Sequence, residues 1–92
     1  MDGRVVGYAI VSKQFFHRRF VDYLHVHPDF RRKGAANAML EFIESASEET
    51  LWISTGRDND AMHGLLSRRR YVPSGIVHHL ARMPEIIFHK PR

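Results

Sequence analysis

The spacing of apolar residues predicts two strands near the N-terminus. β-branched and aromatic residues dominate residues 4–12 and again residues 20–25, a composition typical of strands. The basic stretch 13–19 lies between them and is predicted to be a connector. Residues 4–25 are therefore expected to form an antiparallel hairpin.

After residue 34 the spacing of apolar residues becomes helical. Apolar side chains recur every three or four positions up to about residue 45, which predicts an amphipathic helix. The face expected to pack on a sheet carries Ala35, Met39, Phe42, Ile43 and Ala46. Residues 51–55 follow as a short apolar strand of the kind that is buried on both faces, with Trp52 in the core. Strand, helix and strand in this order predict a parallel pair joined by a right-handed crossover.

A second helix is predicted over residues 60–69. Asp58 or Asn59 can cap its first turn, because a side-chain oxygen there accepts from the free backbone N–H groups. The side chains expected to be buried are Met62, Leu65 and Leu66.

Two closing strands are predicted after this helix. Residues 71–75 are expected to be a connector, and residues 76–83 and 85–89 to be strands. Pro84 separates them, since proline cannot donate to a sheet ladder. The chain is thus predicted to be a single domain over residues 1–92, of the α/β class, with a mixed sheet of about five strands and two helices.

Composition narrows the classes of function. The chain has 92 residues and no cysteine, which excludes disulfides, thiolate metal sites and a cysteine nucleophile. It shows no apolar run of membrane-spanning length and no signal-peptide pattern, so a cytoplasmic location and no membrane partner are expected. The net charge of +4 favours anionic partners.

The junction between residues 20–25 and the first helix has the features of a phosphate site. Gly34 and Ala36 are small residues two positions apart, and three cations precede them. A strand that turns into a helix leaves free N–H groups at the positive end of the helix dipole, where phosphate oxygens bind if no side chain blocks them. The chain has neither the dinucleotide pattern G-x-G-x-x-G nor the triphosphate pattern G-x-x-x-x-G-K-[ST].

The pattern around this junction resembles that of a known family. Arg31-x-x-Gly34-x-Ala36, after Val26-x-Pro28, is similar to the acetyl-coenzyme A signature (R/Q-x-x-G-x-G/A) of the GNAT superfamily of N-acetyltransferases. The later segment 59–71 resembles the family's N-x-x-A-x-x-L-Y-x-x-x-G-F stretch. In this segment Met62, Leu66 and Arg70 replace the family's alanine, tyrosine and glycine.

The resemblance implies direct transfer of an acetyl group from acetyl-coenzyme A (acetyl-CoA) to a primary amine of a small molecule or peptide. The implied cofactor-binding residues have three places along the ligand. Val26 would lie beside the pantetheine arm, and Asn59 would contact the lower part of coenzyme A. The pyrophosphate would be held by Arg31, Arg32, Lys33, Gly34, Ala35, Ala36 and Asn37.

The proton transfers of such a reaction need a base for the amine and an acid for the thiolate. Asp22, His25 and His27 are the candidate bases, and Tyr71 and Tyr23 are the candidate acids. The family's usual acid is the tyrosine whose place Leu66 takes.

The resemblance also implies a fold that lacks the family's first strand and N-terminal helices. A natural minimal member, a partner chain that completes the fold and a truncated gene product are three explanations. The sheet edge at which those elements would lie is expected to pair, which predicts a homodimer.

Other classes of function stay open. A non-catalytic coenzyme A-binding or assembly module fits the loss of the tyrosine. Segment 15–20 interleaves aromatic and basic residues, and residues 68–70 are arginines. A small basic nucleic-acid-binding domain is therefore a rival that ranks below the acetyltransferase. His25, His27, His78 and His79 lack a further ligand at a suitable spacing, so no metal is predicted.

Overall fold

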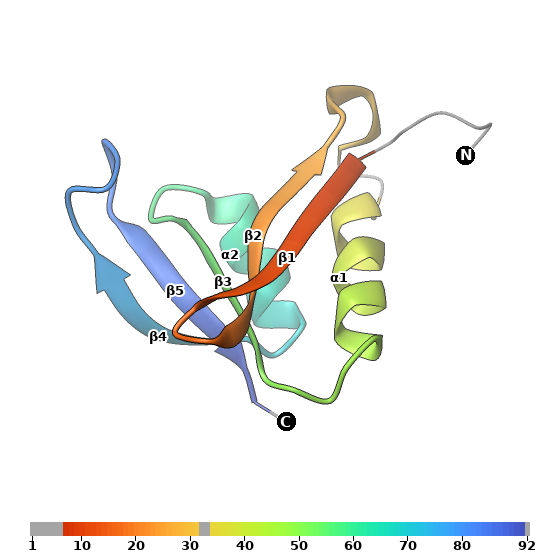
Figure 1. Ribbon diagram of the computed structural model, residues 1–92. Coiled ribbons are helices and arrows are strands. Elements are labelled where there is room, and N and C mark those ends of the chain that lie inside the picture. The colour runs from red at the N-terminus through yellow and green to blue at the C-terminus, as the bar shows by residue number, and fades with distance from the viewer. Residues whose placement is uncertain (1–6, 32–33, 92) are drawn as a thin grey trace.

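A computed structural model describes residues 7–31 and 34–91, which form a five-stranded mixed sheet and two helices (Figure 1). In chain order the elements are β1 (Gly7–Phe15), β2 (Arg18–Val26), the 3-10 turn η1 (Pro28–Phe30), α1 (Ala35–Ser45), β3 (Leu51–Gly56), α2 (Asp60–Arg68), β4 (Val72–Val77) and β5 (Glu85–Lys90). The strand order is β1-β2-β3-β5-β4, with β2 and β3 parallel and the other neighbours antiparallel. The predicted α/β class, mixed sheet and parallel crossover are confirmed.

The predicted connector over residues 13–19 is wrong. β1 continues to Phe15 and β2 begins at Arg18, so only Phe16 and His17 form the turn. Both have positive φ angles, 51° and 61°, as the two central residues of a type I′ turn do. That turn normally contains asparagine or glycine, and neither occurs here to indicate it.

The predicted bounds of the first closing strand are also wrong. The strand β4 lies within residues 72–77, mostly inside the predicted connector, and residues 78–83 lie outside any strand. Pro73 is tolerated because β4 is at the edge of the sheet, and the pairing with β5 shifts between Pro73 and Gly75.

The core lies between the two helices and one face of the sheet. Its buried members are Val21, Leu40, Ile43, Leu51, Ile53, Leu66, Tyr71 and Phe88. The inward face of α1 is set by residues three or four apart: Leu40, Ile43 and Glu44 are all buried. Phe42 is 77% exposed, so its predicted place in the core is wrong, because it projects from another side of the helix.

The opposite face of the sheet carries a group of rings. Trp52 lies there, half-buried, with ring centroids of Phe15 and His89 at 5.7 Å and 5.0 Å from its own. Trp52 therefore belongs to this second group rather than to the buried core.

A bulge in β2 shapes the site. Ile10 pairs with Tyr23 and Val11 with Val21, so Asp22 is an extra residue in β2 with no partner in this register. Such a bulge bends its strand. The parallel pairing of β2 with β3 comprises two residue pairs, Phe20 with Trp52 and Val21 with Ile53, and it stops immediately before the bulge. Beyond that point β2 and β3 diverge (Figure 1).

The helix α2 ends in a Schellman motif. The N–H of Arg70 donates to the carbonyl of Ser67 at 3.0 Å, and that of Tyr71 to the carbonyl of Leu66 at 2.9 Å. Arg70 itself has a φ of 69°, in the left-handed region. This is the position at which the GNAT pattern has glycine, a residue that adopts this conformation without steric cost.

Neither helix in the described part of the chain combines the length and apolar content needed to cross a membrane.

Candidate functional site

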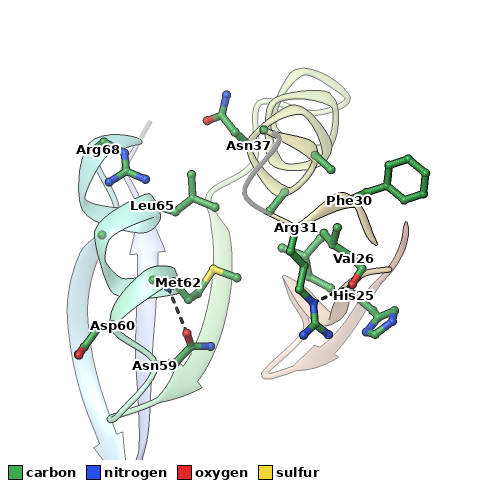
Figure 2. A pocket seen from close by; sticks show the side chains of 16 residues that line it. His25, Val26, Phe30, Arg31, Asn37, Asn59, Asp60, Met62, Leu65 and Arg68 are labelled. Carbon is green, nitrogen blue, oxygen red and sulfur yellow. Dashed lines mark hydrogen bonds between the residues drawn. The ribbon is translucent and has the colours of Figure 1, made fainter. Parts of the chain in front are cut away.

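A cleft of about 720 Å³ lies where β2 and β3 diverge. One wall is the end of β2 with the first turn of α1, and the other is α2 (Figure 2). Its lining includes Leu24, His25, Val26, Phe30, Arg31, Gly34, Ala35, Ala36, Asn37, Asn59, Met62, Leu65 and Arg68. Seven of the nine predicted cofactor-binding residues are in this set, and Arg32 and Lys33 lie outside the described residues.

The start of α1 provides backbone donors to the cleft. Gly34 is the N-cap with φ 80° and ψ 6°, and its carbonyl accepts the first helical hydrogen bond, from the N–H of Ala38 at 3.0 Å. Helix geometry leaves the N–H groups of residues 35–37 without acceptors inside the helix. A Cβ added at Gly34 would meet nothing within 4 Å, so the backbone angle, not crowding, favours glycine there.

The segment between β2 and α1 is held by two local hydrogen bonds. The Nε of Arg31 donates to the carbonyl of Val26 at 3.1 Å, which folds Arg31 back along the end of β2 (Figure 2). The N–H of Asp29 donates to Nδ1 of His27 at 3.2 Å, which caps η1. These contacts keep the Arg31 cation beside the cleft.

The opposite wall is the start of α2. Asn59 caps this helix, as predicted, because its Oδ1 accepts from the N–H of Met62 at 3.2 Å. The Nε2 of His63 lies 3.0 Å from the carbonyl oxygen of Gly56. A carbonyl can only accept, so His63 donates here and ties α2 to the end of β3.

The predicted catalytic residues are not brought together. His25 lines the cleft, whereas Asp22 is exposed in the bulge and Tyr71 is buried in the core, and neither of these two is in the lining. The Tyr71 hydroxyl donates to Oε2 of Glu44 at 2.8 Å, so it is not placed to give a proton to a leaving group in the cleft. Tyr23 is 55% exposed and stacks on Tyr8.

Glu44 is the centre of a buried charge cluster, which contacts the cleft residue Asn37 through Arg69. Its side chain is 8% exposed and accepts from Arg69, Lys90 and Tyr71. Burial alone would raise the pKa of Glu44, but these hydrogen bonds outweigh it and lower the pKa from 4.5 to about 2. The same contact with Glu44 raises the pKa of the Arg69 guanidinium. Both groups are therefore charged at neutral pH.

Sequence reasoning missed Arg68 and the part that Arg69 plays. Ala61, Gly64, Leu65 and Arg68 recur at helical spacing and line the cleft from one side of α2, a spacing that can be found in the sequence. Arg69 contacts Asn37 and Glu44, which are 32 and 25 positions away, and no local pattern indicates such a contact.

No group of three or more histidine, aspartate or glutamate side chains suited to a metal ion occurs within residues 7–31 and 34–91.

Comparison with known proteins settles the family. The model of the acetyltransferase (GNAT) family matches residues 1–70. The chain belongs to this family. The superfamily expected from the sequence is thereby confirmed.

Two sequence relatives of this GNAT chain are named acetyltransferases. The protein of Pectobacterium atrosepticum is 32% identical and that of Yersinia enterocolitica 35% identical, each over 75 residues. Each match covers 77% of this chain and 52% of the relative, so the chain spans about half the length of these relatives.

Solved structures show the same fold. A GNAT acetyltransferase from Bacillus cereus matches with a TM-score of 0.90 and 31% identity, over 100% of this GNAT chain and 68% of that one. The ribosomal-protein-S18-alanine N-acetyltransferase of Escherichia coli matches with a TM-score of 0.85 and 23% identity, over 99% of this chain and 64% of that one. A GNAT acetyltransferase from Elizabethkingia anophelis was solved with acetyl-CoA bound. It matches with a TM-score of 0.88 and 12% identity, over 98% of this chain and 71% of that one.

Proposed function

We propose that the cleft binds acetyl-CoA and that the chain takes part in acetyl transfer to a primary amine. The observation that carries this proposal is the start of α1 at Gly34, which lines the cleft opposite α2. Backbone N–H groups at a helix start bind phosphate oxygens, and acetyl-CoA carries a pyrophosphate. Membership in the acetyltransferase family and the bound acetyl-CoA of the Elizabethkingia protein support the choice of ligand.

The lining of the cleft fits the parts of such a ligand. The N–H groups of residues 35–37 and the cations Arg31 and Arg68 suit its phosphates, while Met62 and Leu65 offer an apolar wall to its pantetheine arm. Arg32 and Lys33 are proposed to add to the cationic side. Asn59 and the backbone at Val26 are proposed to contact the arm between the two walls.

The chemistry that acetyl-CoA supplies is an acetyl group on a thioester, which an amine can attack. Among the predicted bases only His25 is in the lining of the cleft, with its ring 5.4 Å from that of Tyr8, and histidine is the most common general base in enzymes. We assign it to the removal of a proton from the acceptor amine, which is a small molecule or a peptide. The acid for the departing thiolate is not assigned to Tyr71, because its hydroxyl is engaged by Glu44.

Calorimetric titration with acetyl-CoA tests the binding step. Gly34→Glu puts bulk and negative charge at the helix start, and Gly34→Asn is its matched control, because asparagine tolerates the left-handed backbone of this residue. We expect native protein and Gly34→Asn to bind alike and Gly34→Glu to bind at least about tenfold more weakly. A folded native protein that does not bind acetyl-CoA would refute the proposal.

A screen for acetylation of amines by native protein and a His25→Gln variant then tests the transfer step. Binding without transfer by the native protein would indicate a non-catalytic coenzyme A-binding module instead.

We also propose that the chain forms a homodimer through β1. This strand is an edge of the described sheet, and its Tyr8 and Ile10 are about half exposed. An edge strand with apolar side chains tends to pair with another chain.

A further inference from the structure

Asn37 lies at the boundary between the cleft and the buried charge cluster. It is in the first turn of α1 and lines the cleft, at the α1 wall in Figure 2. Its Oδ1 accepts a hydrogen bond from Nη1 of Arg69 at 2.8 Å.

This contact identifies which atom of the Asn37 amide is the oxygen and which is the nitrogen. A guanidinium has only donors, so the Asn37 atom that faces Arg69 must be the oxygen. The amide NH₂ is then directed away from Arg69, and Asn37, an exposed residue in the lining of the cleft, keeps its two side-chain donors available.

Arg69 is itself held in place. Its Nε donates to Oε2 of Glu44 at 3.0 Å and its Nη2 to Oε1 at 2.6 Å, a two-point contact between planar groups. Its side chain is 16% exposed and that of Glu44 8%. The guanidinium therefore cannot turn toward a ligand without breaking a buried ion pair, and Glu44 offsets its charge.

We propose that Arg69, fixed by Glu44, is a positioning residue that holds the Asn37 amide with its NH₂ toward an anionic group in the cleft. This inference rests on the proposed function, in which that group is a phosphate of acetyl-CoA. Arg69 acts through orientation: a donor that is already fixed loses less conformational entropy when the phosphate binds. Asn37 is thus a neutral side-chain donor beside the backbone donors of α1.

The Asn37→Asp variant distinguishes an effect on acetyl-CoA affinity from an effect on stability. The aspartate has the shape of asparagine and can still accept from Arg69, and a carboxylate in the first turn of a helix is favourable. Its second oxygen, however, takes the place of the NH₂ and repels a phosphate. We expect unchanged or higher stability and affinity for acetyl-CoA lowered at least about tenfold. Ala38→Asp is the control, since it adds the same charge at the next position, which is exposed and outside the cleft lining.

Arg69→Lys tests the positioning itself. Lysine keeps a positive charge for Glu44 but has no second planar arm for Asn37. We expect affinity lowered about threefold to tenfold, and we expect Asn37→Ala to weaken binding less in the Arg69→Lys protein than in native protein. Calorimetric titration with acetyl-CoA measures all these affinities, and chemical unfolding measures stability.

The outcomes distinguish the two proposals. If native protein and Ala38→Asp bind alike and Asn37→Asp binds weakly, with coupling between residues 37 and 69, the inference stands. Asn37→Asp that binds as native protein does, or additive effects at the two positions, would overturn it while Gly34→Glu still supports the proposed function. Native protein that binds no acetyl-CoA would overturn both.

Discussion

Arg70 has a backbone conformation that is unfavourable for its residue type. It is the C′ residue of the Schellman motif that ends α2, and its φ of 69° is sterically costly for a residue with a Cβ. The hydrogen bonds of Arg70 and Tyr71 to α2 keep this conformation in place. In the sequence, Arg70 departs from the glycine of the GNAT pattern, and its φ angle shows that this departure has a steric cost.

Arg70→Gly is expected to stabilise the protein by about 1 kcal/mol, because glycine adopts the left-handed region without strain. Chemical unfolding of both proteins measures the difference. Arg70→Ala is the control: it also removes the charge but keeps the Cβ, so we expect no comparable gain. Equal gains in both variants would point to charge rather than to backbone conformation.

Glu44 gives stability a dependence on pH. Its pKa is lowered from 4.5 to about 2 in the folded state, so its contribution is fully present above about pH 4.5 and is lost as the pH falls toward about 2. The shift corresponds to about 3 kcal/mol. We expect Glu44→Gln to lower the free energy of unfolding by roughly this amount at pH 7. Between about pH 5 and 2, the variant should lose less stability than the native protein does.

The free energy of unfolding, measured by denaturant titration across this pH range, tests the expectation for Glu44. Glu48→Gln is the matched control, since Glu48 is an exposed carboxylate near the end of the same helix. If the native and Glu44→Gln proteins lose stability in parallel as the pH falls, another group is responsible.

At the scale of elements, the sequence predicted which elements form and in what order. The change of spacing after residue 34 and the Asn59 cap are local signals, and both helices are present. Features that depend on a partner strand were not predicted. The Phe16–His17 turn lacks the usual turn residues, and Pro73 and Gly75 made the edge strand β4 resemble a connector.

The candidate site divides in the same way. Gly34, the small residues after it and Asn59 could be identified from local pattern and are found in the cleft. The burial of Tyr71 and the contact of Arg69 with Asn37 depend on how α1, α2 and β5 pack, which spacing along one segment does not show.

The bulge at Asp22 is the feature of β2 that we expect to open the cleft. Without Asp22, the apolar alternation of Val21, Leu24 and Val26 would be regular, because Asp22 is the one unpaired residue between Val21 and Tyr23. Deletion of Asp22 should therefore keep the side chains of Val21, Leu24 and Val26 on the same face of the sheet. It should also let β2 continue straight beside β3.

We expect the deletion of Asp22 to change stability little, by about 1 kcal/mol, and to lower affinity for acetyl-CoA at least about tenfold by narrowing the cleft. Calorimetric titration and chemical unfolding measure the two effects. Asp22→Ala removes the carboxylate but keeps the extra residue, so it should bind as the native protein does. Equal losses of binding in both variants would assign the effect to the carboxylate.

At the scale of the whole molecule, the arrangement of the sheet leaves β1 at an edge. Helices cover one face of the sheet, and the aromatic group around Trp52 lies on the other. Beside the edge, Ile10 is 53% exposed, more than an isoleucine in a closed core would be.

Ile10→Lys tests the proposed homodimer. A lysine on an edge strand disfavours pairing with another chain, so we expect the native protein to sediment as a dimer at high concentration and Ile10→Lys as a monomer. Ile76→Lys is the control, because Ile76 has similar exposure on β4 at the opposite edge. A native protein that remains monomeric at every concentration would contradict the proposal.

The two residue pairs that join β2 to β3 have a consequence for motion. They form a narrow seam between a hairpin, β1 with β2, and a three-stranded unit of β3, β5 and β4. Few hydrogen bonds resist separation there, so amide hydrogens along the seam should exchange through local opening rather than through global unfolding. A molecule bound between α1 and α2 would contact both units. Because it would bind the closed form, it should lower the population of the open form and slow amide exchange along the seam.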